Sequence, residues 1–531
     1  MRKFVSLHIG LCAVLMVTCL GAARHTRSAV FAEHQPNRIV LENRHQGNDG
    51  WQLPWAGYTV TDDTNLQIKG YPAFESVAPG ETIPLKITVN PAQRYAVDVF
   101  RLGHYQGLGG RLMEHLGPFD GRPQPVCGIV KVTRMNVCAW STSVALHIPD
   151  SWLSGVYVAV LTNAQKYQSL IPFWVVEENR HSDMLYISSV NTYEAYNNFP
   201  YDPPASNPQG LPQTGHSLYD FNSAGNMPAV KVTFDRPFNA QYGGPGDGGL
   251  YDFEPELISF VEGSGYDVTY TIEPVTDERP WILQFHKMVV VGGHAEYQTM
   301  NNYNALFSAR DAGTALAFIS GNEIYWQVRY EGLDGVTRRI VVGYKNTAPD
   351  PCKDPRYRTI KWRQLGRPEQ RLIGVQLPSN GWMNWGGQPW VPVHTEHWAF
   401  ADTGLHTGDP VKAQISGYEI DAYDSRVGLP DGTEYTLLSA SPFITYRHHN
   451  FTQNSSIYRS LSGNWVWASG SMDWSWGLSP GGSKNGHGHN VRHALQVMTR
   501  NIFNRMLRDA PVARQPLRLT WSLPNAENPC Q

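Results

Sequence analysis

Three short segments of the sequence place carboxylate, imidazole and phenol side chains directly after apolar runs. These segments are VNTYEAYNNF (190–199), VVVGGHAEYQ (289–298) and FISGNEIYWQ (318–327). In the second segment, His294 and Glu296 follow an apolar run and two glycines. An imidazole and a carboxylate placed close together can move protons to and from a substrate, and either group can ligate a metal ion.

The elements around these segments indicate why their polar side chains should meet. Apolar runs at 184–189, 287–291 and 315–320 alternate with helical patterns, which predicts a parallel sheet with helical crossovers. Ligands of open parallel sheets bind beyond the carboxyl ends of the strands. The two glycines of the second segment allow a tight turn at that edge. The polar side chains expected to converge there are Tyr193, Tyr196, His294, Glu296, Asn322 and Glu323.

An alternative role for Glu296 is structural. At a turn from a strand into a helix, Glu296 can cap the helix that follows, at 299–313, and favour its dipole. The spacing alone favours neither this cap nor a functional site.

Two other patterns are less specific. NGHGHNVRH (485–493) holds His487, His489 and His493, and the last two have the spacing of a helical metal pair, but the glycines and asparagines favour a solvated loop. Ser320 precedes Gly321 without the GxSxG pattern of a hydrolase nucleophile. The sequence has no GxGxxG or Walker-type loop, so no nucleotide cofactor is indicated.

Composition limits the class of partner and the compartment. The 531 residues carry a formal net charge of -3, which gives no field for binding nucleic acid. Residues 1–28 combine a basic start, an apolar run and small residues, which predicts a secretory signal peptide. A membrane anchor is the alternative. We therefore expect a secreted or periplasmic protein with no stable membrane span in its mature form.

Four cysteines lie beyond the predicted signal peptide, and an oxidising compartment makes disulfides plausible. Cys127 and Cys138 flank a hairpin-like segment, and Cys352 can pair with Cys530. Four cysteines permit three pairings, so the sequence does not decide between them.

The chain is long enough for several domains. Period-2 segments between Pro/Gly turns predict an N-terminal antiparallel β-sandwich over 36–178. An α/β parallel-sheet domain of the flavodoxin or amidotransferase type is predicted over 182–345, with a long lid loop at 199–250 over the strand ends. Residues 346–510 predict a β-rich extension with a closing helix, and 511–531 a C-terminal tail.

An ordered set of motifs is similar to one known family. VFRLGHYQGLGGRL, NTYEAYNN, HSLYDF, VTFDRPF, VVVGGHAEYQ, ARDAGTALAFISGNEIYWQVR, SGYEID and DWSWGL occur in the order seen in the large (β) subunit of N,N-dimethylformamidase and its relatives. The resemblance extends over roughly residues 95 to 508.

This resemblance implies an amide hydrolase with one mononuclear iron, expected as Fe³⁺, held by two tyrosines and one glutamate. Matched by motif, the metal ligands are Tyr196 of EAYNN, Tyr219 of SLYDF and Glu296 of HAEY. Phenolate and carboxylate are hard oxygen donors that suit ferric iron better than zinc. Tyr193 and Tyr242 are alternatives for the two tyrosines.

The resemblance also implies three catalytic residues around the metal, His294, Asn322 of the SGN turn and Glu419 of GYEID. His294 or Glu419 would move the proton. Asn322 would donate to a developing oxyanion. Glu323, beside Asn322, adds an acid near the cavity.

The implied substrate is a small-molecule amide. Because the formamidase works with a small subunit, a small subunit or a homo-oligomer is expected here. Ala295 and Gln298 stand where relatives carry an acid and a tryptophan. The alternative function is a non-catalytic secreted envelope protein that binds a carbohydrate or peptide, because the tryptophans of NGWMNWGGQPW (380–390) suit stacking on sugars.

Overall fold

The computed structural model describes residues 35–241, 246, 248–345, 347–378, 387–481, 487–511 and 530. The chain divides into two units, residues 1–36 and 37–531, and everything below concerns the second. The predicted signal peptide, Tyr242 and nearly all of the predicted tail lie outside the described residues. Within the described ranges, no helix is both long and apolar enough to cross a membrane.

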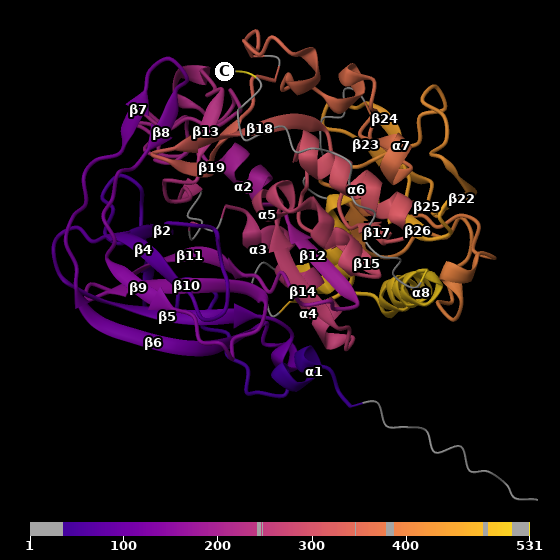
Figure 1. Ribbon diagram of the computed structural model, residues 1–531, viewed down its shortest axis with the longest axis horizontal. Coiled ribbons are helices and arrows are strands. Elements are labelled where there is room, and N and C mark those ends of the chain that lie inside the picture. The colour runs from indigo at the N-terminus through magenta and orange to yellow at the C-terminus, as the bar shows by residue number, and fades with distance from the viewer. Residues whose placement is uncertain are drawn as a thin grey trace, which may run out of the picture. The chain divides into compact units, whose positions relative to one another are not determined.

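The N-terminal part of this unit consists of antiparallel sheets that share a core, and its strands lie together in Figure 1. Their main pairs are antiparallel, and only the short edge strands β1 and β3 run parallel to β11. The strands are β1 (Thr59–Val60), β3 (Ser76–Val77), β5 (Arg94–Leu102), β6 (Gly110–Asp120), β10 (Gly155–Asn163) and β11 (Tyr167–Val175) in one sheet, and β2 (Lys69–Pro72), β4 (Thr82–Thr88) and β9 (Val144–His147) in the other.

Two disulfides link cysteines of this unit. One joins Cys127 to Cys138 across the hairpin of β7 (Gly128–Val130) and β8 (Met135–Val137). The other joins Cys352 to Cys530. Of the three pairings that the sequence permits, the structure contains the one that follows the hairpin.

The central sheet is mixed and has the strand order β14-β12-β15-β17-β26-β25-β22. The first five strands are parallel, and β25 and β22 continue the sheet in antiparallel fashion. The strands are β12 (Met184–Ser188), β14 (Val268–Ile272), β15 (Met288–Val291), β17 (Ala315–Phe318), β22 (Gly432–Leu437), β25 (Ser456–Ser460) and β26 (Trp465–Ala468). The predicted parallel sheet is therefore present, and part of the predicted β-rich extension belongs to it. The predicted domain boundaries stay predictions.

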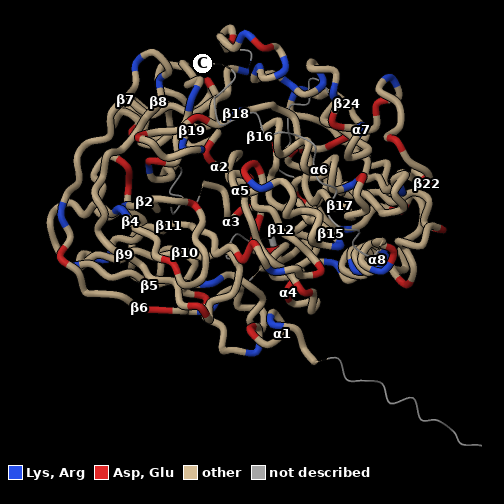
Figure 2. Tube along the Cα trace, viewed as in Figure 1, with Lys and Arg blue, Asp and Glu red and all other residues tan. Residues whose placement is uncertain are grey.

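Helices and one smaller sheet complete the surroundings of the central sheet (Figure 1). The smaller sheet has the order β13-β19-β18-β16, with β13 (Lys231–Thr233), β16 (Tyr297–Thr299), β18 (Trp326–Leu333) and β19 (Val336–Val342). The helices are α1 (Arg38–Glu42), α2 (Val190–Tyr196), α3 (Leu250–Phe253), α4 (Pro255–Gly263), α5 (Glu273–Glu278), α6 (Met300–Ala312), α7 (Gln370–Ile373) and α8 (His493–Asp509). Along the chain, Lys and Arg are interspersed with Asp and Glu (Figure 2).

Helix α6 begins and ends where its sequence predicts. The Thr299 side chain accepts a hydrogen bond from the Asn302 backbone N–H, and Gly313 ends the helix at φ 104°. Thr299 is therefore the N-cap. The alternative that Glu296 caps this helix is wrong, because the short strand β16 separates Glu296 from it.

A buried ion pair joins the N-terminal sheets to the central sheet. Arg101 of β5 and Glu262 of α4 are both fully buried and form a two-pronged contact at 2.8 and 3.1 Å. Tyr270 of β14 donates a further hydrogen bond to Glu262 at 2.8 Å. Removing one partner of such a pair leaves an uncompensated charge inside the protein.

We expect Arg101→Ala to lower the free energy of unfolding by about 3–5 kcal/mol, measured by urea denaturation with circular dichroism. Arg94 lies on the same strand, and its pair with Asp120 is exposed, with side-chain exposures of 58% and 89%. Arg94→Ala is therefore the matched control and should change stability by less than about 1 kcal/mol. Equal losses in the two variants would contradict the importance of the buried pair.

Candidate metal centre and catalytic cluster

The carboxyl ends of β12, β15 and β17 supply most of the predicted site residues. Tyr196 ends α2, which follows β12, while His294 and Glu296 follow β15 and Asn322 follows β17. Glu419 arrives from a later segment whose backbone pairs with residues 470–472. Tyr219 comes from the long connection between α2 and β13. All six predicted side chains thus meet at one edge of the sheet, linked by the contacts that follow.

Glycines make this close packing possible. Gly293 has φ 72°, and a Cβ there would lie 2.6 Å from the Tyr193 hydroxyl. A Cβ on Gly321 would lie 2.5 Å from the Glu419 carbonyl oxygen. Only glycine allows the turns after β15 and β17 to approach the neighbouring segments so closely.

Two phenol oxygens converge on the carboxylate of Glu296. The Tyr196 hydroxyl donates to one Glu296 carboxylate oxygen at 3.0 Å, and the Tyr219 hydroxyl donates to both at 2.9 Å. The two phenol rings are stacked with centroids 4.3 Å apart. Burial, followed by the charge of Glu296, raises the pKa of both phenols well above the usual value. As placed, both tyrosines are therefore neutral.

This donor set fits a small, highly charged cation. With metal–oxygen bonds of about 2.0–2.2 Å, two donors at a right angle lie about 2.8–3.1 Å apart, which is the spacing found here. A strongly polarising ion is needed to ionise the phenols. In the described part of the chain, no three His, Cys, Asp or Glu side chains are grouped to hold a metal. The site is a candidate metal centre because two phenol oxygens join the Glu296 carboxylate.

A histidine and a second carboxylate lie beside these donors. His294 Nε2 lies 3.0 Å from a Glu419 oxygen and 3.5 Å from a Glu296 oxygen. Burial alone would lower the pKa of His294, but Glu419 and Glu296 outweigh it and raise the pKa to about 10. Burial would likewise raise the pKa of Glu296, but the hydrogen bond and charge of His294 hold it below the usual value. The site therefore contains an imidazolium between two carboxylates.

Asn322 holds Glu419 in place. Its side-chain Nδ2 donates to a Glu419 oxygen at 2.8 Å, and its backbone N–H donates to Asp421 at 3.0 Å. The residue has φ 56°, and its Oδ1 atom is buried without a hydrogen-bond partner. Asparagine tolerates this left-handed conformation better than most residues. This contact gives Asn322 a positioning role, and its role as an oxyanion donor stays a prediction.

A family model described as N,N-dimethylformamidase beta subunit-like, C-terminal, matches residues 96–489. The chain belongs to this family. The N,N-dimethylformamidase beta subunit of Alcaligenes sp is 23% identical over 441 residues, which are 72% of this chain and 56% of that protein. The same subunit of Paracoccus aminophilus is 22% identical over 438 residues, 71% of this chain and 55% of that protein.

This chain thus spans about half the length of the curated dimethylformamidase subunits that it matches. Among solved structures, the sulfur carrier protein SoxY from Chlorobium limicola f thiosulfatophilum matches 23% of this chain and 87% of its own at 12% identity. The TM-score of 0.13 is too low to carry an argument.

The tyrosine alternatives separate clearly in this family member. The Tyr193 hydroxyl donates to Glu254 at 2.7 Å, away from Glu296, although the two tyrosines lie on the same helix. Tyr242, the alternative to Tyr219, lies outside the described residues. Tyr196 and Tyr219 are therefore the phenols observed at Glu296.

The structure also places Glu323 and the histidines of the 485–493 segment. Glu323 is buried, and burial followed by the charge of Asp421 raises its pKa well above the usual value, which disfavours the extra negative charge that the sequence suggests. His489 belongs to a 3-10 turn at 487–490 and His493 begins α8, so the two do not form a helical metal pair.

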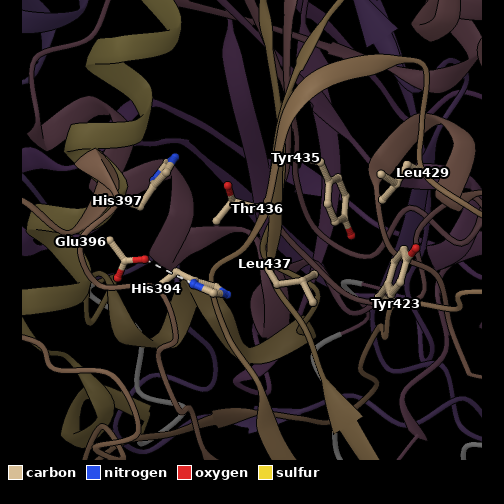
Figure 3. A pocket seen from close by; sticks show the side chains of 8 residues that line it. All are labelled: His394, Glu396, His397, Tyr423, Leu429, Tyr435, Thr436 and Leu437. Carbon is tan, nitrogen blue, oxygen red and sulfur yellow. Dashed lines mark hydrogen bonds and ion pairs between the residues drawn. The ribbon is translucent and has the colours of Figure 1, made fainter.

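The tryptophan-rich segment and the cavity described next are both separate from the six site residues. Trp390, in the segment with possible sugar-stacking tryptophans, is fully buried and packs against Trp474, while Trp382 and Trp385 lie outside the described residues. Figure 3 shows a separate cavity of about 480 Å³. None of the six site residues lines it; its walls are His394, Glu396, His397, Tyr423, Leu429, Tyr435, Thr436 and Leu437.

Two residues outside the predicted ligand and catalytic sets also belong to this cluster. The Lys345 Nζ atom donates to the Tyr297 hydroxyl at 2.9 Å, and Tyr297 in turn donates to the Tyr219 hydroxyl. Burial lowers the pKa of Lys345 to about 7, although Glu296 opposes this shift. Tyr297 directly follows Glu296, which is a usable signal, whereas no motif marks Lys345.

In the metal-free protein, we expect His294 to be doubly protonated at about pH 8. In the folded protein the pKa of His294 is raised to about 10. Protonation of His294 therefore stabilises the folded state. This contribution to the free energy of unfolding is complete below the unfolded pKa of about 6.5 and is lost as the pH rises through 10. ¹⁵N NMR of histidine-labelled protein measures this protonation directly. Glu419→Gln should lower the pKa of His294.

His286 provides an internal control in the same spectra. Burial lowers its pKa to about 4, so its ring should remain neutral at about pH 8. A His294 ring that titrates near 6.5 and does not respond to Glu419→Gln would contradict the arrangement.

Proposed function

We propose that this chain is an amide hydrolase that uses one iron ion, expected as Fe³⁺, to cleave a small carbon–nitrogen amide bond. The observation that carries the proposal is the convergence of Tyr196, Tyr219 and Glu296 beside an imidazolium in a member of the dimethylformamidase family. A bound ion of this kind polarises an amide carbonyl and lowers the pKa of water.

The protein's own groups provide the proton transfers that amide hydrolysis needs. One proton must leave the attacking water and one must reach the leaving nitrogen. Glu419 is held by Asn322 and His294, so its carboxylate is positioned to accept the first proton. His294 carries a proton on Nε2 and is positioned to deliver the second.

Burial of the site supports a small substrate. His294, Glu296, Asn322 and Glu419 are between 2% and 7% exposed, and the ring of Phe253 lies 6.1 Å from that of His294. A confined site excludes bulk water, which strengthens the interactions of its charges. The substrate class proposed is a short, weakly polar amide with small substituents on nitrogen.

Compartment and assembly also belong to the proposal. The disulfides Cys127–Cys138 and Cys352–Cys530 support a location outside the reducing cytoplasm. The chain covers only 56% and 55% of the two dimethylformamidase beta subunits. We therefore also propose that activity requires a small subunit or self-association of this chain, and both should be tested.

The purified protein should contain about one iron per chain and show a tyrosinate-to-iron charge-transfer band. Glu296→Ala should lose iron, band and amidase activity, because it removes the carboxylate to which both phenols bind. Tyr196→Phe should lower activity by more than the about 10- to 100-fold typical of outer-shell residues. Metal analysis, absorption spectra and hydrolysis of N-alkyl formamides measure these effects.

Tyr193→Phe is the matched control, because it removes a buried hydroxyl from the same helix that bonds to Glu254 and not to Glu296. It should retain iron and the absorption band. Full iron content in Glu296→Ala, or a wild-type protein unable to take up ferric or ferrous iron, would overturn the proposal.

A further inference from the structure

Lys345 is buried next to the phenols without an acid at ion-pair distance. The residue is 8% exposed and follows β19. No ion pair of Lys345 occurs among the described residues, although other buried cations, such as Arg101 and Arg236, have carboxylate partners. A buried ammonium without a carboxylate is unfavourable unless other groups compensate it.

The compensation comes from aromatic rings and one hydroxyl. The Nζ atom lies 3.3 Å from the centroid of the Tyr219 ring and 5.0 Å from that of Trp326. It also donates to the Tyr297 hydroxyl at 2.9 Å. A cation is attracted to the face of an aromatic ring, and this attraction increases when the ring carries negative charge.

We propose that Lys345 is a positioning residue and counter-ion for the metal centre, which stabilises Tyr219 in its ionised form directly and through Tyr297. This inference rests on the proposed function, because only a bound metal ionises Tyr219. It identifies a role for a cation that no motif marks.

The direction of the hydrogen bonds supports this role. Lys345 donates to Tyr297, Tyr297 donates to Tyr219, and Tyr219 donates to Glu296. If Tyr219 gives up its proton to become a ligand, its oxygen still accepts from Tyr297. Hydrogen bonds to the charged form of a group favour that form. The chain of donors is thus already oriented toward the phenolate.

Charge explains why a lysine is useful at this position. Loading the site converts two neutral phenols into phenolates beside an existing carboxylate, in a region closed to water. A positive charge in van der Waals contact with one ring lowers the free energy of that ionisation. Among the described residues, aromatic rings and the Tyr297 hydroxyl surround the Lys345 amine, and no carboxylate lies at ion-pair distance from it.

Lys345→Met should therefore have opposite effects on the two states. Ferric uptake, followed by the charge-transfer band during titration of metal-free protein, should weaken by about 10- to 100-fold, as for other outer-shell partners. The band should move to longer wavelength, because the phenolate electrons lose a stabilising cation. Thermal unfolding of the metal-free variant should occur at or above the wild-type temperature, since an unpaired buried charge has been removed.

Lys361→Met is the matched control. Lys361 lies 4.7 Å from the Tyr325 ring and 5.4 Å from the Trp326 ring, whereas it is Lys345 that contacts the Tyr219 ring and the Tyr297 hydroxyl. Its variant should show wild-type uptake and band position. Tyr297→Phe, which keeps the charge and removes the relay, should shift the band and weaken uptake less than Lys345→Met.

The outcomes separate this inference from the proposed function. Wild-type protein that takes up no iron overturns both. Normal iron binding and an unmoved band in Lys345→Met overturn the role of Lys345 alone. If the Lys345→Met variant does not fold, the Tyr297→Phe variant decides. Unchanged iron uptake and an unmoved absorption band in Tyr297→Phe would then overturn the proposed role of Lys345.

Discussion

The site depends on the hydrogen bonds that the buried carboxylate of Glu296 accepts from two phenols. The carboxylate accepts these hydrogen bonds from phenols that are 100 and 77 residues away in the chain, and it faces His294. Because Glu296 is 2% exposed, these partners replace the water that would otherwise solvate it. The turn after β15 fixes where this carboxylate lies, so the central sheet fixes the site.

Charge in this region is balanced over several groups. The imidazole of His294 lies between Glu296 and Glu419, and the Lys345 Nζ atom lies over the Tyr219 ring. Burial raises the pKa of the nearby Glu323, which disfavours its charged form. Such perturbed groups at one place are typical of functional sites.

The N-terminal sheets contribute to the site through the loop that carries Tyr219. Asn136 of β8 donates to the Thr214 carbonyl at 3.1 Å and accepts from the His216 backbone N–H at 2.9 Å. The Cys127–Cys138 disulfide closes the hairpin that holds Asn136. With the Arg101–Glu262 pair, these contacts make the N-terminal part a support for the phenol side of the cluster.

The sequence by itself determined the local features. Apolar runs and capping residues predict the strands of the parallel sheet and helix α6, and the glycine turn predicts His294 and Glu296 at the sheet edge. The strand-end pattern also predicts Tyr196 and Asn322, while the motif resemblance adds Tyr219 and Glu419; the structure brings all four together. These features depend on residues close in the chain, or on a preserved order of motifs, and can therefore be read without coordinates.

Only the tertiary structure decided which groups touch. Tyr193 and Tyr196 are equivalent by pattern, yet packing directs the first to Glu254 and the second to Glu296. The position of Lys345 over Tyr219 follows from pairing of β19 with β13 and β18, which brings together residues 126 positions apart in the chain. The protonation of His294 and Glu323 also depends on burial and on neighbours distant in sequence. Periodicity records which face of an element is apolar, but it does not record what that face packs against.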